Sequence, residues 1–424
     1  MNTQSMKAAT IDPVVNVNAD TNAAQAKPNS SLPRVLKPLK NLHGGCIRFS
    51  GVVTGQVGDT NSDLQCNIDV LDSKLFSLVV QQGVLGAAEG YLRGYWTSDD
   101  LVVLVQILVR NRDRLDQMNS SLVARFSQFV LRLWYAGRRN NIEGSQRNIA
   151  EHYDLSNDFF KLFLDPTMMY SSAVFEAQNQ TLEAASVHKL ELICQKLELK
   201  PFDRVVEIGS GWGGFAIYAA KHYGCQVTTV TISQAQYDEA VARVKQAGLE
   251  HRVTVRMQDY RDITGQFDKL VSIEMIEAVG HQYLSTYFEQ CRKLLRPNGL
   301  ALIQAITIDD QRYAKALKTV DYIKRYIFPG SFIPCTSLLV DQAAKQNLRT
   351  VGLQDIGQSY ALTLNHWRQR FFTALPEVQA LGFDARFIRM WEFYLCYCEG
   401  GFKEGAISTI QLLLQARSNQ MHQV

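Results

Sequence analysis

A glycine-rich run at 205–215, VVEIGSGWGGF, is the segment of this chain best suited to binding a ligand. Because glycine has no Cβ, Gly209, Gly211 and Gly213 let the backbone turn tightly and approach a bound molecule closely. Strand-like residues precede the glycines, and the helical stretch 216–223 follows them. This order is typical of the first strand–helix turn of a doubly wound sheet, where ligands bind at the carboxyl ends of the strands. A purely structural glycine turn is the alternative.

Three features of this region favour S-adenosylmethionine (SAM) over a nicotinamide dinucleotide. Glu207 is an acidic residue inside the strand, and Trp212 interrupts the glycines. The next strand, QVTTVTIS at 226–233, ends in Thr and Ser, where nicotinamide-dependent enzymes place an Asp or Glu on the ribose. The sequence therefore predicts SAM as the co-substrate.

Composition and charge narrow the class of protein. The chain has 424 residues, enough for two or three domains, and a net charge of +3. Residues 110–147 hold eight Arg against three acidic residues, which predicts an anionic surface as partner or, alternatively, a solvated helix face. Near-neutral overall charge argues against a nucleic-acid partner. The eight cysteines lack paired spacing and indicate reduced thiols in a cytosolic protein without a metal site.

The chain divides into three segments. Residues 1–40 are rich in Asn, Ala, Pro and Lys and are expected to be a disordered tail. Residues 41–140 are expected to form a smaller mixed α+β domain at a lipid or membrane surface, and 149–418 a large α/β domain. No run approaches the roughly 18 apolar residues of a membrane-spanning helix. The stretch 121–139 is amphipathic and could lie in a bilayer interface; packing against the main domain is the alternative.

Hydrophobic patterns predict the individual elements. In the smaller domain, β-like runs occupy 46–53, 64–71 and 73–83, and a helical pattern with Ser98 as an N-cap covers 86–113. In the large domain, the strands are expected at 203–208, 226–231, 252–257, 268–273, 299–306, 348–358 and 405–416. Helices are expected near 183–198, 213–223, 234–247 and 281–295. The aromatic segments 309–347 and 362–402 are expected to be helical and could supply an apolar pocket.

Five linked motifs carry a resemblance to a known family. They are HYDLSNDFFKLFLDPTMMYSSAVFE (152–176), VVEIGSGWGGFA (205–216), VTTVTISQAQ (227–236), IEMIEAVG (273–280) and RYIFPG (325–330). Together they resemble the cyclopropane-fatty-acyl-phospholipid synthases and their mycolic-acid methyltransferase relatives. The resemblance covers about 149–415, and GAAEGYLRGYW (86–96) is similar to the smaller domain of the phospholipid-acting members.

That resemblance implies a SAM-dependent C-methyltransferase that adds a carbon to the double bond of an unsaturated acyl chain in phospholipid. Together with the basic stretch of the smaller domain, it predicts reversible peripheral binding to the inner, cytoplasmic face of the membrane; a homodimer is left open. Two other readings remain: a methyltransferase for a soluble small molecule, and a non-catalytic lipid-binding relative.

Methyl transfer to an alkene sets its own chemical demands. An alkene is a poor nucleophile, so the sulfonium carbon must be held against it in a dry slot, and the resulting cation needs an anion and a base. Glu277 is the best candidate for the anion, with Glu274 as its rival. The resemblance implies that Glu277 helps to hold a bicarbonate ion that serves as base, and that Tyr360 donates a hydrogen bond to the same anion.

Two departures from the family affect this expectation. The better-known members read Tyr-Ser-Cys where this chain has Tyr170, Ser171 and Ser172, and they carry a His where this chain has Gln304. Ser172 still offers a backbone N–H and a hydroxyl. Gln304 donates and accepts hydrogen bonds but does not titrate near neutral pH. Ring closure is therefore in doubt, and a methylene- or methyl-branched chain is the alternative.

The resemblance also assigns residues to SAM and to the pocket. Gly209 and Gly211 allow the backbone approach, and Glu207 supports the loop or meets the amino acid moiety. The remaining positions, from the methionine end through the ribose to the adenine, are Tyr170, Ser171, Thr231, Gln236, Asp259 and Tyr260. Cys398 falls on a cysteine position of the family, but the chemistry needs no thiolate, which favours a pocket residue.

Overall fold

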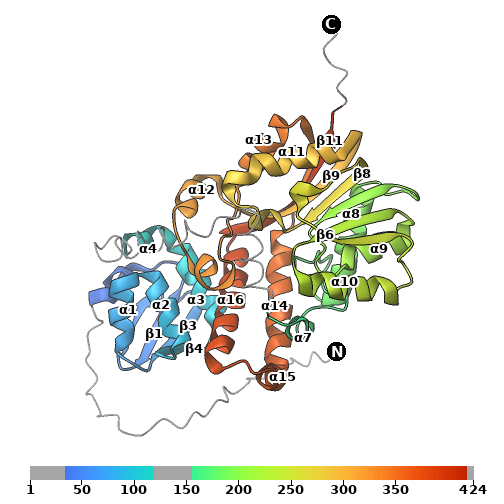
Figure 1. Cartoon of the computed structure of the whole chain (residues 1–424). Coiled ribbons are helices and arrows are strands. Elements are labelled where there is room, and N and C mark those ends of the chain that lie inside the picture. The colour runs from blue at the N-terminus through green and yellow to red at the C-terminus, as the bar shows by residue number, and fades with distance from the viewer. Residues whose placement is uncertain (1–33, 119–154, 418–424) are drawn as a thin grey trace, which may run out of the picture.

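The computed structural model describes residues 34–118 and 155–417, which form two domains with long helices between them (Figure 1). The smaller domain comprises residues 34–118. The larger one is built on a sheet of seven strands. Helices α14 (Gly357–Thr373) and α16 (Ala385–Lys403) lie side by side at the centre of the molecule, between the two sheets.

The large sheet has the strand order β10-β11-β9-β8-β5-β6-β7. Its strands are β5 (Arg204–Ile208), β6 (Gln226–Thr231), β7 (Val253–Met257), β8 (Phe267–Ile273), β9 (Leu295–Ile308), β10 (Leu348–Asp355) and β11 (Ile407–Ala416). The five strands from β5 to β9 pair in parallel, and β11 and β10 extend the sheet in antiparallel fashion. The doubly wound α/β sheet predicted from the sequence is confirmed.

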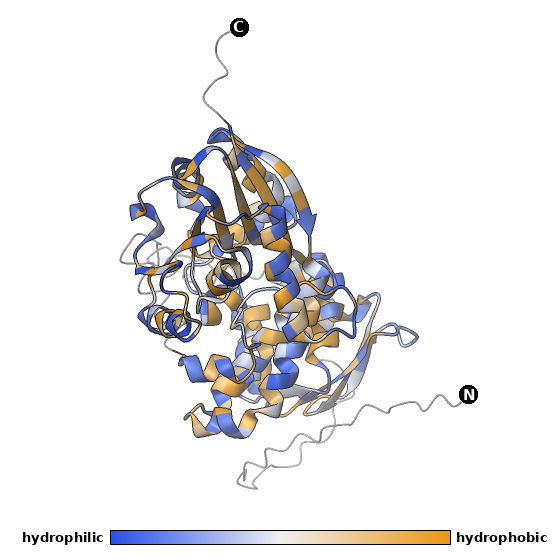
Figure 2. Ribbon diagram, turned by 90° about the vertical axis from the view of Figure 1, so that its right-hand side faces the viewer, coloured by the Kyte–Doolittle hydropathy of each residue, from blue (hydrophilic) through white to orange (hydrophobic). Residues whose placement is uncertain are grey.

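Helices cover both faces of this sheet. Helices α8 (Leu182–Lys196), α9 (Gly214–Tyr223) and α10 (Gln234–Gln246) pack on one face, and α11 (Leu284–Leu294) and α13 (Thr336–Lys345) on the other. Adjacent strand residues point to opposite faces of the sheet, so Val205 packs on the side of α8, α9 and α10 and Val206 on the side of α11 and α13. Burial on both faces explains why these strands read as continuous apolar runs. Figure 2 shows hydrophobic residues along these strands.

The predicted strand and helix positions of the large domain are confirmed to within a few residues, except that β9 is longer than expected. The remaining elements of this domain are α7 (Asn157–Lys161), η2 (Tyr260–Asp262), η3 (Ile276–Ala278), η4 (His281–Tyr283), α12 (Asp310–Leu317), η5 (Ile323–Ile327) and α15 (Leu375–Ala380). They lie in the connections and in the two segments that were expected to be helical and aromatic.

The smaller domain packs helices against a four-stranded sheet of order β2-β1-β3-β4. Its elements are η1 (Arg34–Asn41), β1 (Cys46–Gly51), β2 (Gly55–Gly58), β3 (Gln65–Val70), α1 (Lys74–Gln82), α2 (Val84–Leu92), β4 (Trp96–Ser98), α3 (Leu101–Arg110) and α4 (Arg112–Met118). Because Leu36 and Leu39 of η1 are buried, residues 34–40 pack on the smaller domain, although they were expected to belong to the tail. Residues 1–33 lie outside the described part of the chain.

Two local predictions in the smaller domain were wrong. The β-like run at 73–83 is helix α1, because Leu75 and Val79, four residues apart, face the core together. The helical pattern at 86–113 is interrupted by β4 and again at Asn111, so it covers parts of α2 and α4 and all of α3, and the N-cap of α3 is Asp100 rather than Ser98. The Asp100 carboxylate accepts a 2.9 Å hydrogen bond from the Val103 N–H.

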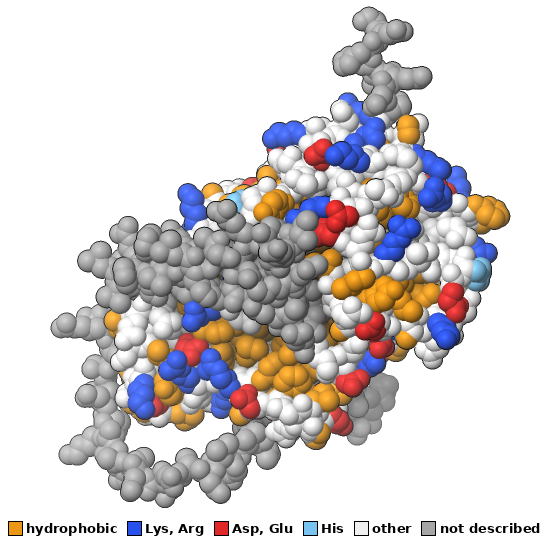
Figure 3. All heavy atoms as spheres, viewed as in Figure 1, with side chains coloured by type: hydrophobic (Ala, Val, Ile, Leu, Met, Phe, Trp, Pro, Cys, Tyr) orange, Lys and Arg blue, Asp and Glu red, His pale blue; other side chains and the backbone are white. Residues whose placement is uncertain are grey.

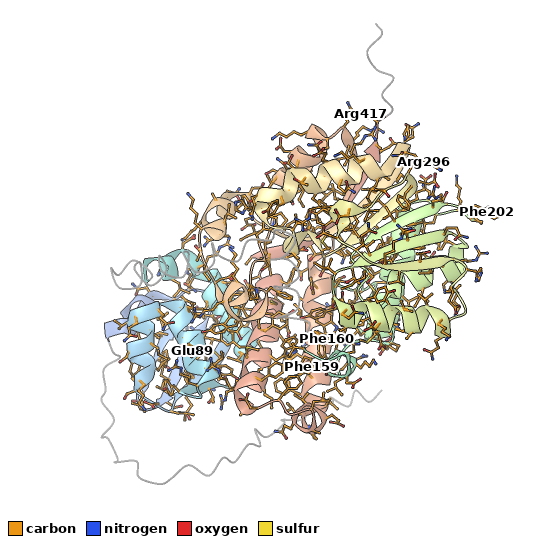
Figure 4. The ribbon with its side chains drawn as sticks, viewed as in Figure 1. Glu89, Phe159, Phe160, Phe202, Arg296 and Arg417 are labelled. Carbon is orange, nitrogen blue, oxygen red and sulfur yellow. The ribbon has the colours of Figure 1, made fainter. Side chains whose placement is uncertain are left out.

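Specific contacts join the two domains. Tyr91 donates a 2.6 Å hydrogen bond to Glu392, and Glu89, labelled in Figure 4, accepts one from Tyr326. A Cβ added to Gly400 of α16 would lie 2.7 Å from Val105 Cγ1, so glycine permits the close approach of α16 to α3. The smaller domain is therefore docked on the helices that wall the site described below.

Only part of the basic stretch at 110–147 is described, and its residues contact the protein itself. Arg110 forms a 2.8 Å ion pair with Glu404, and Arg112 a 2.8 Å pair with Asp309. The amphipathic segment 121–139 lies outside the described residues. On the face in Figure 3, Lys and Arg side chains lie over both domains among acidic ones. Within the described residues, no helix is long and apolar enough to cross a membrane.

Candidate active site

A cavity of about 530 Å³ opens at the carboxyl ends of the parallel strands. The loops after β5, β6 and β8 form one side, the segment 168–171 lies across it, and α14 and α16 form the far wall. Parallel strands that end at one sheet edge bring side chains from distant parts of the sequence together there. Most of the residues predicted to act in catalysis or SAM binding meet at this cavity.

The glycine loop presents its backbone to the cavity. Gly209, Gly211 and Gly213 have φ values of 93°, 47° and 85°, a region that favours glycine over other residues. A Cβ added to Gly211 would meet nothing within 4 Å, so the chain is open to a ligand there. Gly209 and Gly211 line the cavity, whereas Gly213 lies behind them as the N-cap of α9.

Glu207, at the end of β5, reaches the cavity from inside the sheet. Its side chain is buried and accepts a 2.6 Å hydrogen bond from the Thr229 hydroxyl. Burial raises the pKa of Glu207 to about 8. The residue both braces the loop and faces the ligand space, so the two roles proposed for it are compatible.

The segment Tyr170–Ser172 crosses the cavity and is anchored at each residue. The Tyr170 and Tyr394 hydroxyls are 2.9 Å apart, and Ser171 accepts a 2.7 Å hydrogen bond from the Lys189 amine. The backbone N–H of Ser172 donates to Glu274 over 2.9 Å. Tyr170 and Ser171 line the cavity; Ser172 is fully buried behind it.

The opposite rim contains the residues expected at the ribose and adenine. Thr231 donates a 3.0 Å hydrogen bond to the side-chain oxygen of Gln236. The carboxylate of Asp259 is engaged by the Arg261 guanidinium at 2.7 Å, which leaves it less free for an adenine amine than the sequence implied. Tyr260 packs edge-on against Tyr287 with ring centroids 5.7 Å apart and presents an aromatic surface to the cavity.

These features fit SAM. The open backbone at Gly211, the acid at the end of β5 and the aromatic ring of Tyr260 lie around one continuous space. The cavity thus offers contacts for the amino acid part of SAM near Glu207, for the ribose near Thr231 and Gln236, and for the adenine near Tyr260.

Glu274 lies at the centre of the polar network on the other side of the cavity. Its Oε1 accepts hydrogen bonds from the Ser172 N–H at 2.9 Å and the Gln304 amide at 2.8 Å. Its Oε2 accepts one from the Tyr360 hydroxyl at 2.7 Å. Burial raises the pKa of Glu274, while these donors and the Lys189 charge oppose that rise. Glu274 lines the cavity, and Gln304 is fully buried behind it.

Glu277, the other carboxylate, has fewer partners. Its Oε1 accepts a 2.6 Å hydrogen bond from the Ile306 N–H, and its Oε2 is buried without a hydrogen-bond partner. Burial, with the neighbouring charge of Glu274, raises the pKa of Glu277 to about 8. Both glutamates line the cavity.

A separate bicarbonate ion does not fit the contacts of this network. The Tyr360 hydroxyl, which the resemblance assigns to that ion, donates to Glu274. The Gln304 side-chain amide and the Ser172 backbone N–H also donate to Glu274. These are the two positions where this chain departs from the family. The donor set is therefore already satisfied by a carboxylate of the chain.

Part of the remaining wall is apolar and is formed by Ile306, Phe328, Leu364, Tyr394, Cys398 and Phe402. Charged side chains line another part of the same cavity, among them Arg112, Lys315, Asp321 and Lys324. Burial raises the pKa of the Cys398 thiol far above neutral pH, so the thiol stays protonated. This supports the interpretation of Cys398 as a pocket residue. No group of three or more potential metal ligands is present among the described residues.

Sequence reasoning missed Lys189, whose amine is fully buried against Ser171. Burial lowers its pKa to about 8, opposed by the charges of Glu274 and Asp165. A signal was available, since Lys189 follows the buried Ala185 by four residues and precedes the buried Ile193 by four on α8. A lysine on the buried face of a helix indicates a partner for its charge.

Comparisons with known proteins agree with this geometry. The family model for mycolic acid cyclopropane synthetase matches residues 141–412. The chain is 38% identical to the tuberculostearic acid methyltransferase UfaA1 of Mycobacterium tuberculosis, covering 79% of each chain. It is 36% identical to the cyclopropane-fatty-acyl-phospholipid synthase of Escherichia coli K12, covering 83% of this chain and 88% of that protein.

Solved structures show the same fold. The cyclopropane synthase MmaA2 from Mycobacterium tuberculosis superposes with a TM-score of 0.60 at 29% identity, over 64% of this chain and 98% of that one. The mycolic acid cyclopropane synthase CmaA1, solved with SAH and CTAB, gives the same values. The chain belongs to the mycolic acid cyclopropane synthetase family and is a SAM-dependent methyltransferase.

Proposed function

We propose that the protein adds a methyl-derived carbon from SAM to the double bond of an unsaturated acyl chain within a phospholipid. The observation that carries this proposal is the composition of the cavity. A SAM-binding loop and an apolar, aromatic stretch of wall share one space, and the Gln304 amide and the Tyr360 hydroxyl both donate to the carboxylate of Glu274. An acyl chain fits such a wall. The polar groups of a small polar molecule would instead face apolar surface and lack hydrogen-bond partners there.

The residues of this cavity meet the demands of the reaction. SAM, when bound, supplies a methyl carbon attached to a positively charged sulfur. The apolar wall excludes water from the alkene, and it contains the aromatic rings of Phe328 and Tyr394, a residue type whose π system attracts cations. A carboxylate close to the alkene stabilises the positive charge that develops on the chain, an effect worth several kcal/mol in a water-poor site.

The lipid context is supported by relatives rather than by the cavity alone. The Escherichia coli relative is named for fatty-acyl-phospholipid, and other relatives are named as sphingolipid C9-methyltransferases. We propose that this protein works on phospholipid at the cytoplasmic face of the membrane, bound peripherally through the smaller domain and the basic stretch 110–147. Each basic group near an anionic surface contributes roughly 1 kcal/mol.

A second product outcome is favoured by one observation. A cyclopropane ring is the first expectation from the family, but this chain has Gln304 and Ser172 where the better-known members have His and Cys. Because these two replacements alter how the proton is handled at the cation, a methylene-branched chain becomes the alternative product. Both products carry the same number of added carbon atoms.

Expression in a host that makes unsaturated phospholipids tests the proposal. Gas chromatography–mass spectrometry of the fatty acids should show a new peak heavier by one CH₂ unit, and fragmentation then separates a ring from a branch. Purified protein should also methylate lipid vesicles and take up SAM in calorimetry. Turnover of a soluble acceptor with no turnover of vesicles would instead support a small-molecule methyltransferase, and the absence of any new fatty acid would contradict the proposal.

A further inference from the structure

We infer that Glu274 is the catalytic base of this enzyme, so that the reaction needs no bicarbonate ion. This inference rests on the proposed function and names the group that accepts the proton. Three donors from three distant segments converge on its carboxylate: the Ser172 N–H, the Gln304 amide and the Tyr360 hydroxyl. A carboxylate has two acceptor oxygens on one planar carbon. A carbonate-type anion would present the same pair of oxygens to those donors.

The backbone supports a specific role for this side chain. Glu274 has a φ of 49°, in the left-handed region where residues other than glycine are disfavoured by about 1 kcal/mol or more. A half-buried glutamate at such a position indicates that the carboxylate itself is needed, since strain of this kind clusters at functional sites.

The network also selects Glu274 over Glu277 as the anion. Hydrogen bonds donated to a carboxylate favour its charged form, and Glu274 receives three against one from backbone for Glu277. The buried Lys189 adds a positive charge that acts on Glu274. Glu277, with one unpartnered oxygen, is the carboxylate that more readily keeps a proton.

The step balances without any other reactant. The π electrons of the alkene form a bond to the methyl carbon as the sulfur–carbon bond breaks, its electron pair stays on sulfur, and a cation remains on the second alkene carbon. Glu274 then takes a proton from the transferred carbon. The electron pair of that C–H bond closes the ring onto the cation. If a hydride first shifts from the methyl-bearing carbon to the neighbouring cation, the same loss of a proton forms a methylene group instead. Neither product requires a reductant.

Bicarbonate dependence tests this inference. In buffer depleted of CO₂, the wild-type enzyme should methylate vesicles at the same rate as with added bicarbonate. Glu274→Gly should lose activity about a hundredfold or more in depleted buffer, as expected for removal of a general base. Because the glycine variant leaves the three donors without a partner, added bicarbonate or formate should restore part of its activity.

Matched variants keep the result interpretable. Glu274→Gln fills the same space without charge and should be inactive and not rescued, and Glu277→Gly should show no rescue by anions. SAM uptake by calorimetry establishes that each variant is folded. A wild-type rate that falls on CO₂ depletion, or an active Glu274→Gln, would overturn the inference while leaving the proposed function intact. A wild-type enzyme inactive on vesicles under all conditions would instead defeat the proposed function itself.

Discussion

Gln304 points its amide nitrogen at Glu274 over 2.8 Å, and residues outside the cavity fix this orientation. The Lys196 amine donates to the Gln411 oxygen, and the Gln411 nitrogen donates to the Gln304 oxygen at 3.0 Å. Because a lysine can only donate, each amide in the series must turn its oxygen toward Lys196 and its nitrogen toward the cavity. The series therefore holds a donor permanently against Glu274.

Replacing Gln304 with Leu should shift the pH dependence of the reaction. The hydrogen bond from Gln304 favours the charged form of Glu274, so its loss raises the pKa of Glu274 further above the ordinary value. A base acts when deprotonated, so the acidic limb of the kcat/KM profile should move to higher pH. Gln290→Leu, which removes a buried amide bonded to the Ile263 carbonyl, should leave the profile in place. Superimposable profiles for wild type and Gln304→Leu would contradict this role.

Tyr360→Phe should separate catalysis from SAM binding. The variant keeps the ring but loses the 2.7 Å hydrogen bond to Glu274, so kcat should fall about tenfold to a hundredfold. Calorimetric affinity for SAM should be unchanged, because Tyr360 lies on α14, on the opposite side of the cavity from the glycine loop. Tyr218→Phe, which removes a hydroxyl bonded to Glu191 on the outer helices, is the matched control and should retain full turnover. Equal losses in kcat and SAM affinity would show that Tyr360 is structural.

Glu207 should make stability depend on pH. Its pKa is raised by burial to about 8 in the folded protein, so its contribution to stability is fully present below the unfolded value near 4.5 and is lost as pH rises through 8. Glu207→Gln keeps the acceptor for Thr229 but cannot ionise. The free energy of unfolding measured by urea titration without SAM should therefore fall for wild type relative to the variant between pH 5 and pH 8, by an amount on the order of a few kcal/mol. Parallel pH curves would show that Glu207 is not buried in its neutral form.

Charge reversal in the basic stretch should weaken membrane binding. Arg132→Glu/Arg139→Glu should reduce flotation with anionic vesicles, with loss of roughly 1 kcal/mol or more for each site. Lys200→Glu/Lys245→Glu makes the same change in charge at exposed positions of the sheet domain and should float as wild type does. If the two double variants behave alike, binding depends on net charge rather than on the stretch 110–147.

The sequence could predict the sheet and the SAM loop because their signals are local. Apolar strand runs and the positive-φ glycines depend on neighbouring residues, and the structure confirms both. The run at 73–83 was misread because its consecutive apolar residues also fit a strand, and only the burial of Leu75 with Val79 selects a helix. Short apolar runs carry this ambiguity in general.

The different hydrogen-bond partners of the two glutamates could not be predicted for a different reason. Glu274 and Glu277 follow the same strand closely, and their directions depend on the left-handed backbone at Glu274 and on the turn η3 that follows. The partners of Glu274 come from positions 172, 304 and 360. Gln411 also reaches Gln304 only because β11 pairs with β9 in a register that sets these two residues opposite each other. Such long-range registers leave no local trace in the sequence.

The central claim is that a carbon passes from SAM to an acyl double bond, and isotope transfer tests it most directly. Purified enzyme is incubated with unsaturated phospholipid vesicles and SAM whose methyl group carries three deuterons, and the fatty acids are analysed by mass spectrometry. The account predicts a new fatty acid with one added carbon that keeps two of the three deuterons, because the base removes the third. An unlabelled lipid pool after full incubation with SAM would contradict the account.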